Sequence, residues 1–203
     1  MDKLQIGVLA SHSGTTLQAM IDACERGDLD AQVCVVISNN SRSGAAGRAD
    51  RHGIPLCHLS SCTHEDEIAL DDAICETLER FETELVMLAG YMKKIGPRTL
   101  AGFRGRILNT HPALLPKFGG QGTYGDRVHS AVLQAGDPAT GVSIHLVDSE
   151  YDTGPVVAQC EVCVEENDDV QSLSDRVKIR EKEFLIETLQ AIAKRKIKLP
   201  IID

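Results

Sequence analysis

The sequence predicts an α/β fold: a doubly wound, mostly parallel sheet with helices on both faces and a long C-terminal helix. Three observations predict it. Short apolar runs alternate with segments of helical periodicity, as in strands buried between two layers of helices. The 203 residues are 42% hydrophobic and 25% charged, which is ordinary globular composition. Because the chain has no internal repeat, low-complexity tract or long linker, residues 1–203 are expected to form a single domain.

The first half of the chain supplies five predicted strands, which are apolar runs at 6–10, 33–37, 56–59, 85–89 and 106–108. The helix after the first run is expected to bury Leu17, Met20, Ile21 and Cys24 on one face. Thr15 and Gln18 have the spacing of a capping box, and Gly27 is placed to end this helix. Further helices are predicted at 45–50 and 65–80, with a brief one that Gly96-Pro97 starts.

The pattern changes after Asn109. Residues 112–125 contain two prolines and four glycines and are predicted to form a loop, followed by a helix at 128–135. Two strands are expected at 142–147 and 156–164, with the loop 148–154 between them. One long closing helix is marked by apolar residues at Val170, Leu173, Val177, Phe184, Leu189 and Ile192.

Charge and cysteine content restrict the class of protein. A net charge of −9 argues against nucleic-acid or anionic-membrane binding, although a local basic pocket for a small phosphate stays open. No apolar stretch reaches the roughly 18 residues of a membrane span, and the N-terminal apolar run is too short for a signal peptide. Seven cysteines, an odd number, indicate reduced thiols, so a cytoplasmic protein is expected.

The turn Ser11-His12-Ser13-Gly14-Thr15-Thr16 joins the first predicted strand to the first predicted helix. Free backbone N–H groups and a positive helix end suit an anion at such a turn. Gly14 permits close approach, and the two threonine hydroxyls can donate to phosphate oxygens. The turn matches neither the dinucleotide nor the triphosphate glycine pattern. A plain capped turn is the alternative.

Asn109 and His111 lie where a buried strand ends, which is where α/β proteins place ligand chemistry. Two residues apart on extended backbone, both side chains leave on the same face, and Pro112 favours extended geometry at His111. An amide donor beside an imidazole suits stabilisation of a carbonyl oxyanion. A histidine that merely bonds a loop carbonyl is the alternative.

Acidic residues supply two further candidates. The loop 148–154 carries three acids; one of them, such as Asp152, could reach His111, hold its protonated form and raise its pKa, or all three could be solvated. Glu181 lies on the apolar stripe of the last helix, where it either pairs at the rim or binds a polar ligand in a pocket. No metal site is expected, because Cys160 and Cys163 would face opposite sides of a strand.

Five motifs in order resemble the phosphoribosylglycinamide formyltransferase family of the folate-dependent formyltransferase superfamily. They are residues 8–19, 88–92, 108–116, 141–145 and 152–155, with Asn-x-His-Pro-x-Leu-Leu-Pro and a later Asp-x-Gly as the most specific. The resemblance implies transfer of a formyl group from 10-formyltetrahydrofolate, a co-substrate, to glycinamide ribonucleotide in purine synthesis, without a metal. Relatives with an extra N- or C-terminal domain are not expected to fit within 203 residues.

The resemblance also implies roles for single residues. The N-terminal half would bind the nucleotide, and the C-terminal half would bind folate and carry catalysis. The catalytic set would be Asn109, His111 and Asp152. The ribonucleotide would be bound by Gly14, Thr15, Thr16, Pro112 and Glu181. The folate would be bound by Leu88, Met92, Lys93, Lys94, Ile95, Tyr151, Thr153 and Gly154.

The first turn departs from the family pattern Ser-Gly-x-Gly-Ser-Asn, because it keeps one glycine and has Thr16 in place of the asparagine. Lys93 stands where arginine is common, and residues 118–127 are longer than in the shortest members. Two alternatives therefore accompany the expected activity: formylation of another small amine, and a non-catalytic folate or nucleotide sensor. Small-molecule partners and a monomer or homodimer are expected.

Overall fold

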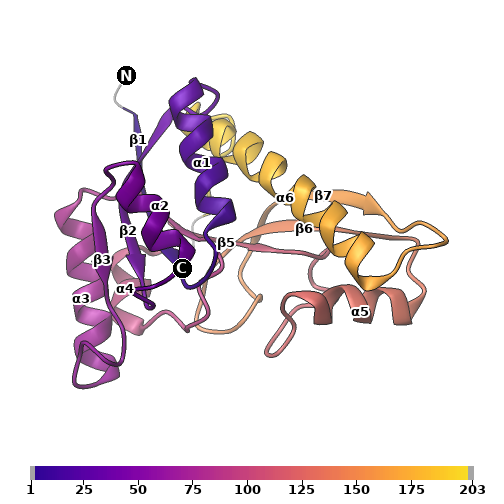
Figure 1. Cartoon of the computed structure of the whole chain (residues 1–203), viewed down its shortest axis with the longest axis horizontal. Helices are drawn as coiled ribbons and strands as arrows, with labels where there is room; N and C mark the ends of the chain where they lie inside the picture. Colours follow the sequence, from indigo (N-terminus) through magenta and orange to yellow (C-terminus); the bar gives the residue numbers. More distant parts are fainter. Residues whose placement is uncertain (1–2, 201–203) are drawn as a thin grey trace. The chain divides into compact units, whose positions relative to one another are not determined.

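The computed structural model describes residues 3–200. Their elements follow the predicted order, with seven strands and six helices in the described part (Figure 1). They are β1 (Leu4–Ala10), α1 (Thr15–Arg26), β2 (Ala31–Ser38), α2 (Gly44–Arg51), β3 (Leu56–His58), α3 (Glu67–Arg80), β4 (Leu85–Leu88), α4 (Pro97–Gly102), β5 (Ile107–His111), α5 (Asp126–Ala135), β6 (Ala139–Leu146), β7 (Val156–Cys163) and α6 (Val170–Ala193).

The predicted fold class is confirmed. The strand order is β3-β2-β1-β4-β5-β6-β7; β1 pairs in parallel with both β2 and β4, and β2 with β3. Only the pairing of β6 with β7 is antiparallel among those with a described register. The described residues form two compact units: unit 1 reaches from the N-terminal side to Leu108 and resumes at Leu189, and unit 2 is Asn109–Thr188.

Unit 1 is built around the apolar strands β1, β2 and β4. The chain moves outward from β1 to β2 and β3, then returns to β4 on the other side of β1. Because parallel crossovers are right-handed, this reversal puts α1 and α2 on one face and α3 and α4 on the other. The helices contact each other in those same pairs, α1 with α2 and α3 with α4. The reversal creates a switch point at the carboxyl ends of β1 and β4, where α/β proteins bind ligands.

Unit 2 has a core of its own, between the β6–β7 hairpin and two helices. One face of the hairpin packs against α5 and α6 through a buried cluster of Val132, Val142, Val162, Leu173 and Val177. Successive side chains of a strand alternate between faces, so Ser143 and His145 of β6 point away from this cluster. Both are fully buried, and the second face of the hairpin is therefore polar.

Two local predictions need correction or extension. The capping box is wrong: Gly14, not Thr15, is the N-cap of α1, with φ 68° and no side-chain cap, and the Gln18 side chain bonds elsewhere. Gly27 ends α1 in the left-handed region with φ 80°, as predicted. The fifth strand runs further than expected, to His111, so Asn109 and His111 lie within β5.

Among residues 3–200, no helix combines the length and the apolar composition that crossing a membrane requires.

Candidate active site

In unit 1, the switch point brings the first turn against the chain that follows β4. The Ser11 N–H donates to the Gly90 carbonyl (3.2 Å), and the Met92 N–H donates to the Ser11 Oγ (2.9 Å). The predicted phosphate turn and the start of the predicted folate segment are therefore neighbours. Leu88 and Ile95 are buried, whereas Met92, Lys93 and Lys94 are exposed.

Position 14 requires a glycine, both because of its backbone conformation and because a side chain there would collide with α2. Its φ of +68° is one that side chains rarely adopt, and a Cβ there would lie 2.6 Å from Cα of Ala45 in α2. The first N–H groups of α1 have no acceptor within the helix, so the turn presents donors at a positive helix end. Thr15 is exposed and Thr16 half-buried. The anion site that the sequence predicts at this turn stays a prediction.

In unit 2, four polar side chains converge from β5, β6 and the loop after β6. The Asn109 Nδ2 lies 3.1 Å from His145 Nε2, and His145 Nε2 lies 3.5 Å from Asp152 Oδ1. The other carboxylate oxygen, Oδ2, lies 3.4 Å from His111 Nδ1. The structure thus brings Asn109, His111 and Asp152 together, as the sequence analysis expected, and adds His145.

Backbone carbonyls fix the proton positions on both imidazoles. His111 Nε2 donates to the Phe118 carbonyl (2.8 Å), because a carbonyl oxygen can only accept. His145 Nδ1 donates in the same way to the Leu146 carbonyl (2.8 Å). In the neutral rings, a lone pair remains at His145 Nε2, which accepts from the Asn109 amide, and at His111 Nδ1, which faces Asp152. Among the described residues, the other N–H of the Asn109 amide takes no acceptor.

Burial and charge oppose each other at His111. Burial lowers its pKa, and although the Asp152 carboxylate and the Phe118 carbonyl raise it, the net shift is downward. Asp152 does reach His111, and its charge acts to raise the pKa of His111, as one interpretation of the loop predicted; the net shift is downward because desolvation of this nearly inaccessible imidazole outweighs that charge. Burial alone would raise the pKa of Asp152; contacts with His145, His111 and the Gly120 N–H lower it instead. Burial thus favours the neutral form of His111, and these contacts favour the ionised form of Asp152.

The loop after β6 is shaped to aim Asp152. Its backbone has φ 58°, unusual for a residue with a side chain, and its Oδ2 accepts from the Gly120 N–H (3.0 Å). Asp148 bonds locally instead, to the Thr153 hydroxyl and the Glu150 N–H. A Cβ at Gly154 would lie 1.9 Å from the Leu146 carbonyl oxygen, so this end of the loop admits only glycine. The Asp148 and Asp152 side chains thus have different partners.

Glu181 turns out to be inside unit 2. Its carboxylate accepts a short hydrogen bond from the hydroxyl of Thr110, which lies between Asn109 and His111 on β5. Burial raises its pKa, against the hydrogen bond from Thr110 and the charges of Lys182 and Lys178. Glu181 is half-buried, and its partner Thr110 is a neutral hydroxyl next to Asn109 and His111, so both interpretations of this residue stay predictions.

A profile of the formyl transferase family matches residues 4–189, which is most of the chain. The chain belongs to the formyl transferase family. The resemblance noted from the motifs is thereby confirmed.

Relatives of this formyltransferase carry more specific names. Phosphoribosylglycinamide formyltransferase from Haemophilus influenzae is 37% identical over 91% of the chain and 84% of its own length. The chloroplastic protein of that name from Vigna unguiculata is 36% identical over 95% of the chain, which spans 62% of that relative's length. The crystal structure of glycinamide ribonucleotide transformylase 1 from Symbiobacterium toebii matches with a TM-score of 0.88 and 34% identity, covering 100% of the chain and 95% of its own.

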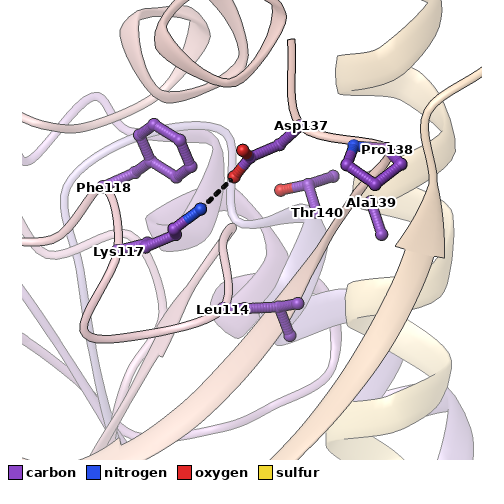
Figure 2. A pocket seen from close by; sticks show the side chains of 7 residues that line it. All are labelled: Leu114, Lys117, Phe118, Asp137, Pro138, Ala139 and Thr140. Carbon is purple, nitrogen blue, oxygen red and sulfur yellow. Dashed lines mark hydrogen bonds and ion pairs between the residues drawn. The ribbon is translucent and has the colours of Figure 1, made fainter. Parts of the chain in front are cut away.

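Unit 2 of the formyltransferase also contains a cavity of about 220 Å³. Figure 2 shows the residues that line it, with the Lys117–Asp137 ion pair (2.8 Å) at one side: Leu114, Lys117, Phe118, Asp137, Pro138, Ala139 and Thr140. None of the four converging side chains lines this cavity. Phe118 connects the two places, since its ring lines the cavity while its carbonyl accepts from His111.

Sequence reasoning gave His145 no role of its own. Its signal was a titratable residue in an apolar strand, on the face opposite Val142 and Ile144. Pro112 is half-buried directly after β5, Tyr151 is exposed, and the Thr153 hydroxyl bonds Asp148.

Within residues 3–200 of the formyltransferase, no group of three or more His, Cys, Asp or Glu side chains is placed to hold a metal ion. The expectation of a metal-free reaction stays a prediction. Cys160 and Cys163 lie on β7, the first half-buried and the second exposed.

Proposed function

We propose that the protein transfers the formyl group of 10-formyltetrahydrofolate to the primary amine of glycinamide ribonucleotide. The products are formylglycinamide ribonucleotide and tetrahydrofolate, a step of purine synthesis. One observation carries this function: in a member of the formyl transferase family, Asn109, His111, His145 and Asp152 converge with an unused amide N–H.

Asn109 is assigned to the oxyanion. When the amine attacks the formyl carbon, the carbonyl oxygen becomes negative, and an amide N–H already oriented toward it stabilises that charge. His145 acts on Asn109 as a positioning residue. Its Nε2 accepts one amide N–H of Asn109, which fixes the orientation of the second N–H. The Leu146 carbonyl in turn fixes the His145 ring.

His111 and Asp152 are assigned to the proton. The amine loses a proton as its bond to carbon forms, and folate N10 gains one as its bond to carbon breaks, so the transfer balances without a further reactant. His111 Nδ1 carries a lone pair next to Asp152, at a distance too long for a strong hydrogen bond (3.4 Å). Negative charge on the reacting oxygen favours protonation of this nitrogen during the reaction, which offsets the effect of burial on its pKa.

Residues of both units are assigned to substrate binding. In unit 1, Gly14, Thr15 and Thr16 would hold the phosphate, with the buried Leu88 and Ile95 and the exposed segment 92–94 against folate. In unit 2, Glu181 and Pro112 would contact the glycinamide portion, and Tyr151, Thr153 and Gly154 the folate. A single domain of residues 1–203 belongs to the same proposal.

The test mixes purified protein with 10-formyltetrahydrofolate and follows deformylation by absorbance, with and without glycinamide ribonucleotide. Deformylation that requires the ribonucleotide is the expected result. Deformylation with another amine but not with the ribonucleotide would show that the acceptor is that amine. Folate binding without turnover for any amine would favour a non-catalytic sensor. Asn109→Ala, His111→Asn and Asp152→Asn serve as control variants, in which turnover is expected to fall.

A cytosolic location and a monomeric or homodimeric state accompany this function. The seven cysteines, all within the described residues, are free thiols, which supports a reducing compartment. Light scattering of the purified protein measures the oligomeric state.

A further inference from the structure

The turn 11–14 of unit 1 is held by the start of α2. The Ala45 N–H donates to the His12 carbonyl (3.1 Å). Gly44 lets the two backbones touch, since a Cβ there would lie 2.5 Å from the Ser13 carbonyl oxygen. The conformation of the turn therefore depends on α2 as well as on Gly14.

Arg48, one turn further along α2, brings a charged group to the turn 11–14. Its Nε donates to the Ser13 carbonyl (2.9 Å), and its Nη1 donates to Gln18 Oε1 (2.8 Å) in the first turns of α1. The planar guanidinium thus connects the turn 11–14 to the helix that follows it. Among the described residues, Nη2 takes no acceptor, so one donor of the fork stays available.

The acceptor of Arg48 is itself fixed. Gln18 Nε2 donates to Asp22 Oδ1 (2.7 Å) and lies 3.0 Å from His52 Nε2, so the amide cannot rotate without losing these partners. His52 Nδ1 lies 2.8 Å from Glu25 Oε1. Gln18, which the sequence suggested for a capping box, instead holds Arg48 in place. A guanidinium fixed by such contacts needs little reorganisation to meet an anion.

The position of this charge matters for an anion at the start of α1. The Ser13 carbonyl belongs to the residue directly before the N-cap Gly14, so its partial negative charge would oppose a phosphate there. Arg48 donates to that carbonyl and adds a full positive charge beside the residue that precedes the N-cap.

We propose that Arg48 is a specificity residue for a phosphate-bearing acceptor: it fixes the turn 11–16 for phosphate and supplies the positive charge beside it. This role rests on the proposed function, since it concerns the ribonucleotide and not the folate. It predicts that Arg48 distinguishes the acceptor with its phosphate from the same acceptor without it.

The experiment compares Arg48→Met and Arg48→Lys with the wild type, using glycinamide ribonucleotide and its dephosphorylated riboside as acceptors. Arg51→Met, an exposed arginine on the same helix, is the matched control. For Arg48→Met, the KM for the ribonucleotide is expected to rise about tenfold to a hundredfold, the worth of a charged hydrogen bond. The KM for 10-formyltetrahydrofolate, the riboside activity and the Arg51→Met values should stay unchanged. Arg48→Lys, which keeps the charge and loses the fork, should lie between.

A purely structural role for Arg48 would change both KM values and the riboside activity alike, and would overturn the assignment. An unchanged ribonucleotide KM would do the same. If Arg48→Met unfolds, competitive inhibition of Arg48→Lys by inorganic phosphate is measured instead. An inhibition constant of Arg48→Lys equal to that of the wild type overturns the assignment. Failure of the proposed function reads differently, because the wild type itself would then not formylate the ribonucleotide.

Discussion

At the scale of single residues, the candidate site depends on few polar contacts in a buried place. Asn109 has one amide N–H bound to His145 and, in the proposed mechanism, the other directed at the substrate oxyanion, so its replacement by alanine deletes that donor. Asn109→Ala is expected to lower kcat by about a hundredfold to a thousandfold with folding intact. Steady-state kinetics measure this, with the exposed Asn167→Ala as the control. Near-normal turnover of Asn109→Ala contradicts the oxyanion role.

Two buried histidines predict how stability depends on pH. Burial lowers the pKa of His111 and of His129; His129 is almost fully buried, faces Lys178, Asp126 and His111, and its Nδ1 has no hydrogen-bond partner among the described residues. The unfolded chain therefore binds protons more readily than the native state at pH values below the ordinary histidine pKa of about 6.5. The free energy of unfolding should rise with pH through this window and level off above it.

Urea melts between about pH 5 and about pH 8 measure this dependence. His129→Phe should flatten the rise, because one of the two depressed pKa values is removed. Asp152 affects stability at lower pH. Because its pKa is lowered in the native state, it stabilises the fold at pH values above the ordinary aspartate pKa of about 3.9. This stabilisation is lost as the pH falls through the native pKa of Asp152. Stability that falls as pH increases from 5 to 6.5 would contradict the assignment of neutral, buried imidazoles.

The residue scale also shows what sequence reasoning can reach. Asn109 and His111 were predicted to share a face because a two-residue spacing on a strand is enough to say so, and β5 includes both. Asp152 could not be separated from Asp148 and Glu150 by spacing, since the choice follows from its positive φ and from Gly120. The Phe118 carbonyl that holds His111 is a backbone group, so residue type carries no sign of it.

At the scale of elements, the two ends of α1 offer a matched pair of glycines. Gly14 and Gly27 both have φ in the left-handed region, but a Cβ at Gly14 would overlap Ala45, whereas nothing lies within 4 Å of a Cβ at Gly27. Gly27→Ala should cost about 1 kcal/mol of stability, which is the conformational penalty alone. Gly14→Ala should cost more than Gly27→Ala and also raise the KM for the ribonucleotide.

Chemical denaturation and steady-state kinetics of the two variants provide the measurement. Equal losses of stability in the two variants would show that α2 shifts to make room for the methyl group at position 14. An unchanged KM for the ribonucleotide in Gly14→Ala would contradict phosphate binding by the turn 11–16. The order and type of the elements were predictable from apolar periodicity, whereas several strands, β5 among them, extend past their apolar runs. The start of α1 was not, because its cap depends on contact with α2, which lies 30 residues further along the chain.

At the scale of the whole molecule, α6 runs from Val170 to Ala193 and thereby belongs to both compact units, since unit 2 ends at Thr188. A helix that is continuous across this point should make the two units unfold together. A single transition is expected when hydrogen exchange is followed in increasing urea for peptides from β4 in unit 1 and β6 in unit 2. Two separate transitions would contradict the single-domain prediction.

The reactive side chains Asn109, His111, His145 and Asp152 all come from one uninterrupted stretch of 44 residues within unit 2. A gene segment that encodes such a stretch can be inherited or recombined as one piece. The turn 11–16, which is proposed to bind the phosphate, lies in unit 1 and can then diverge without breaking the reactive group set. A chimera that exchanges the first hundred codons is therefore expected to change the preference for the phosphate and not for the amine, because Pro112 and Glu181, proposed for the glycinamide portion, lie in unit 2.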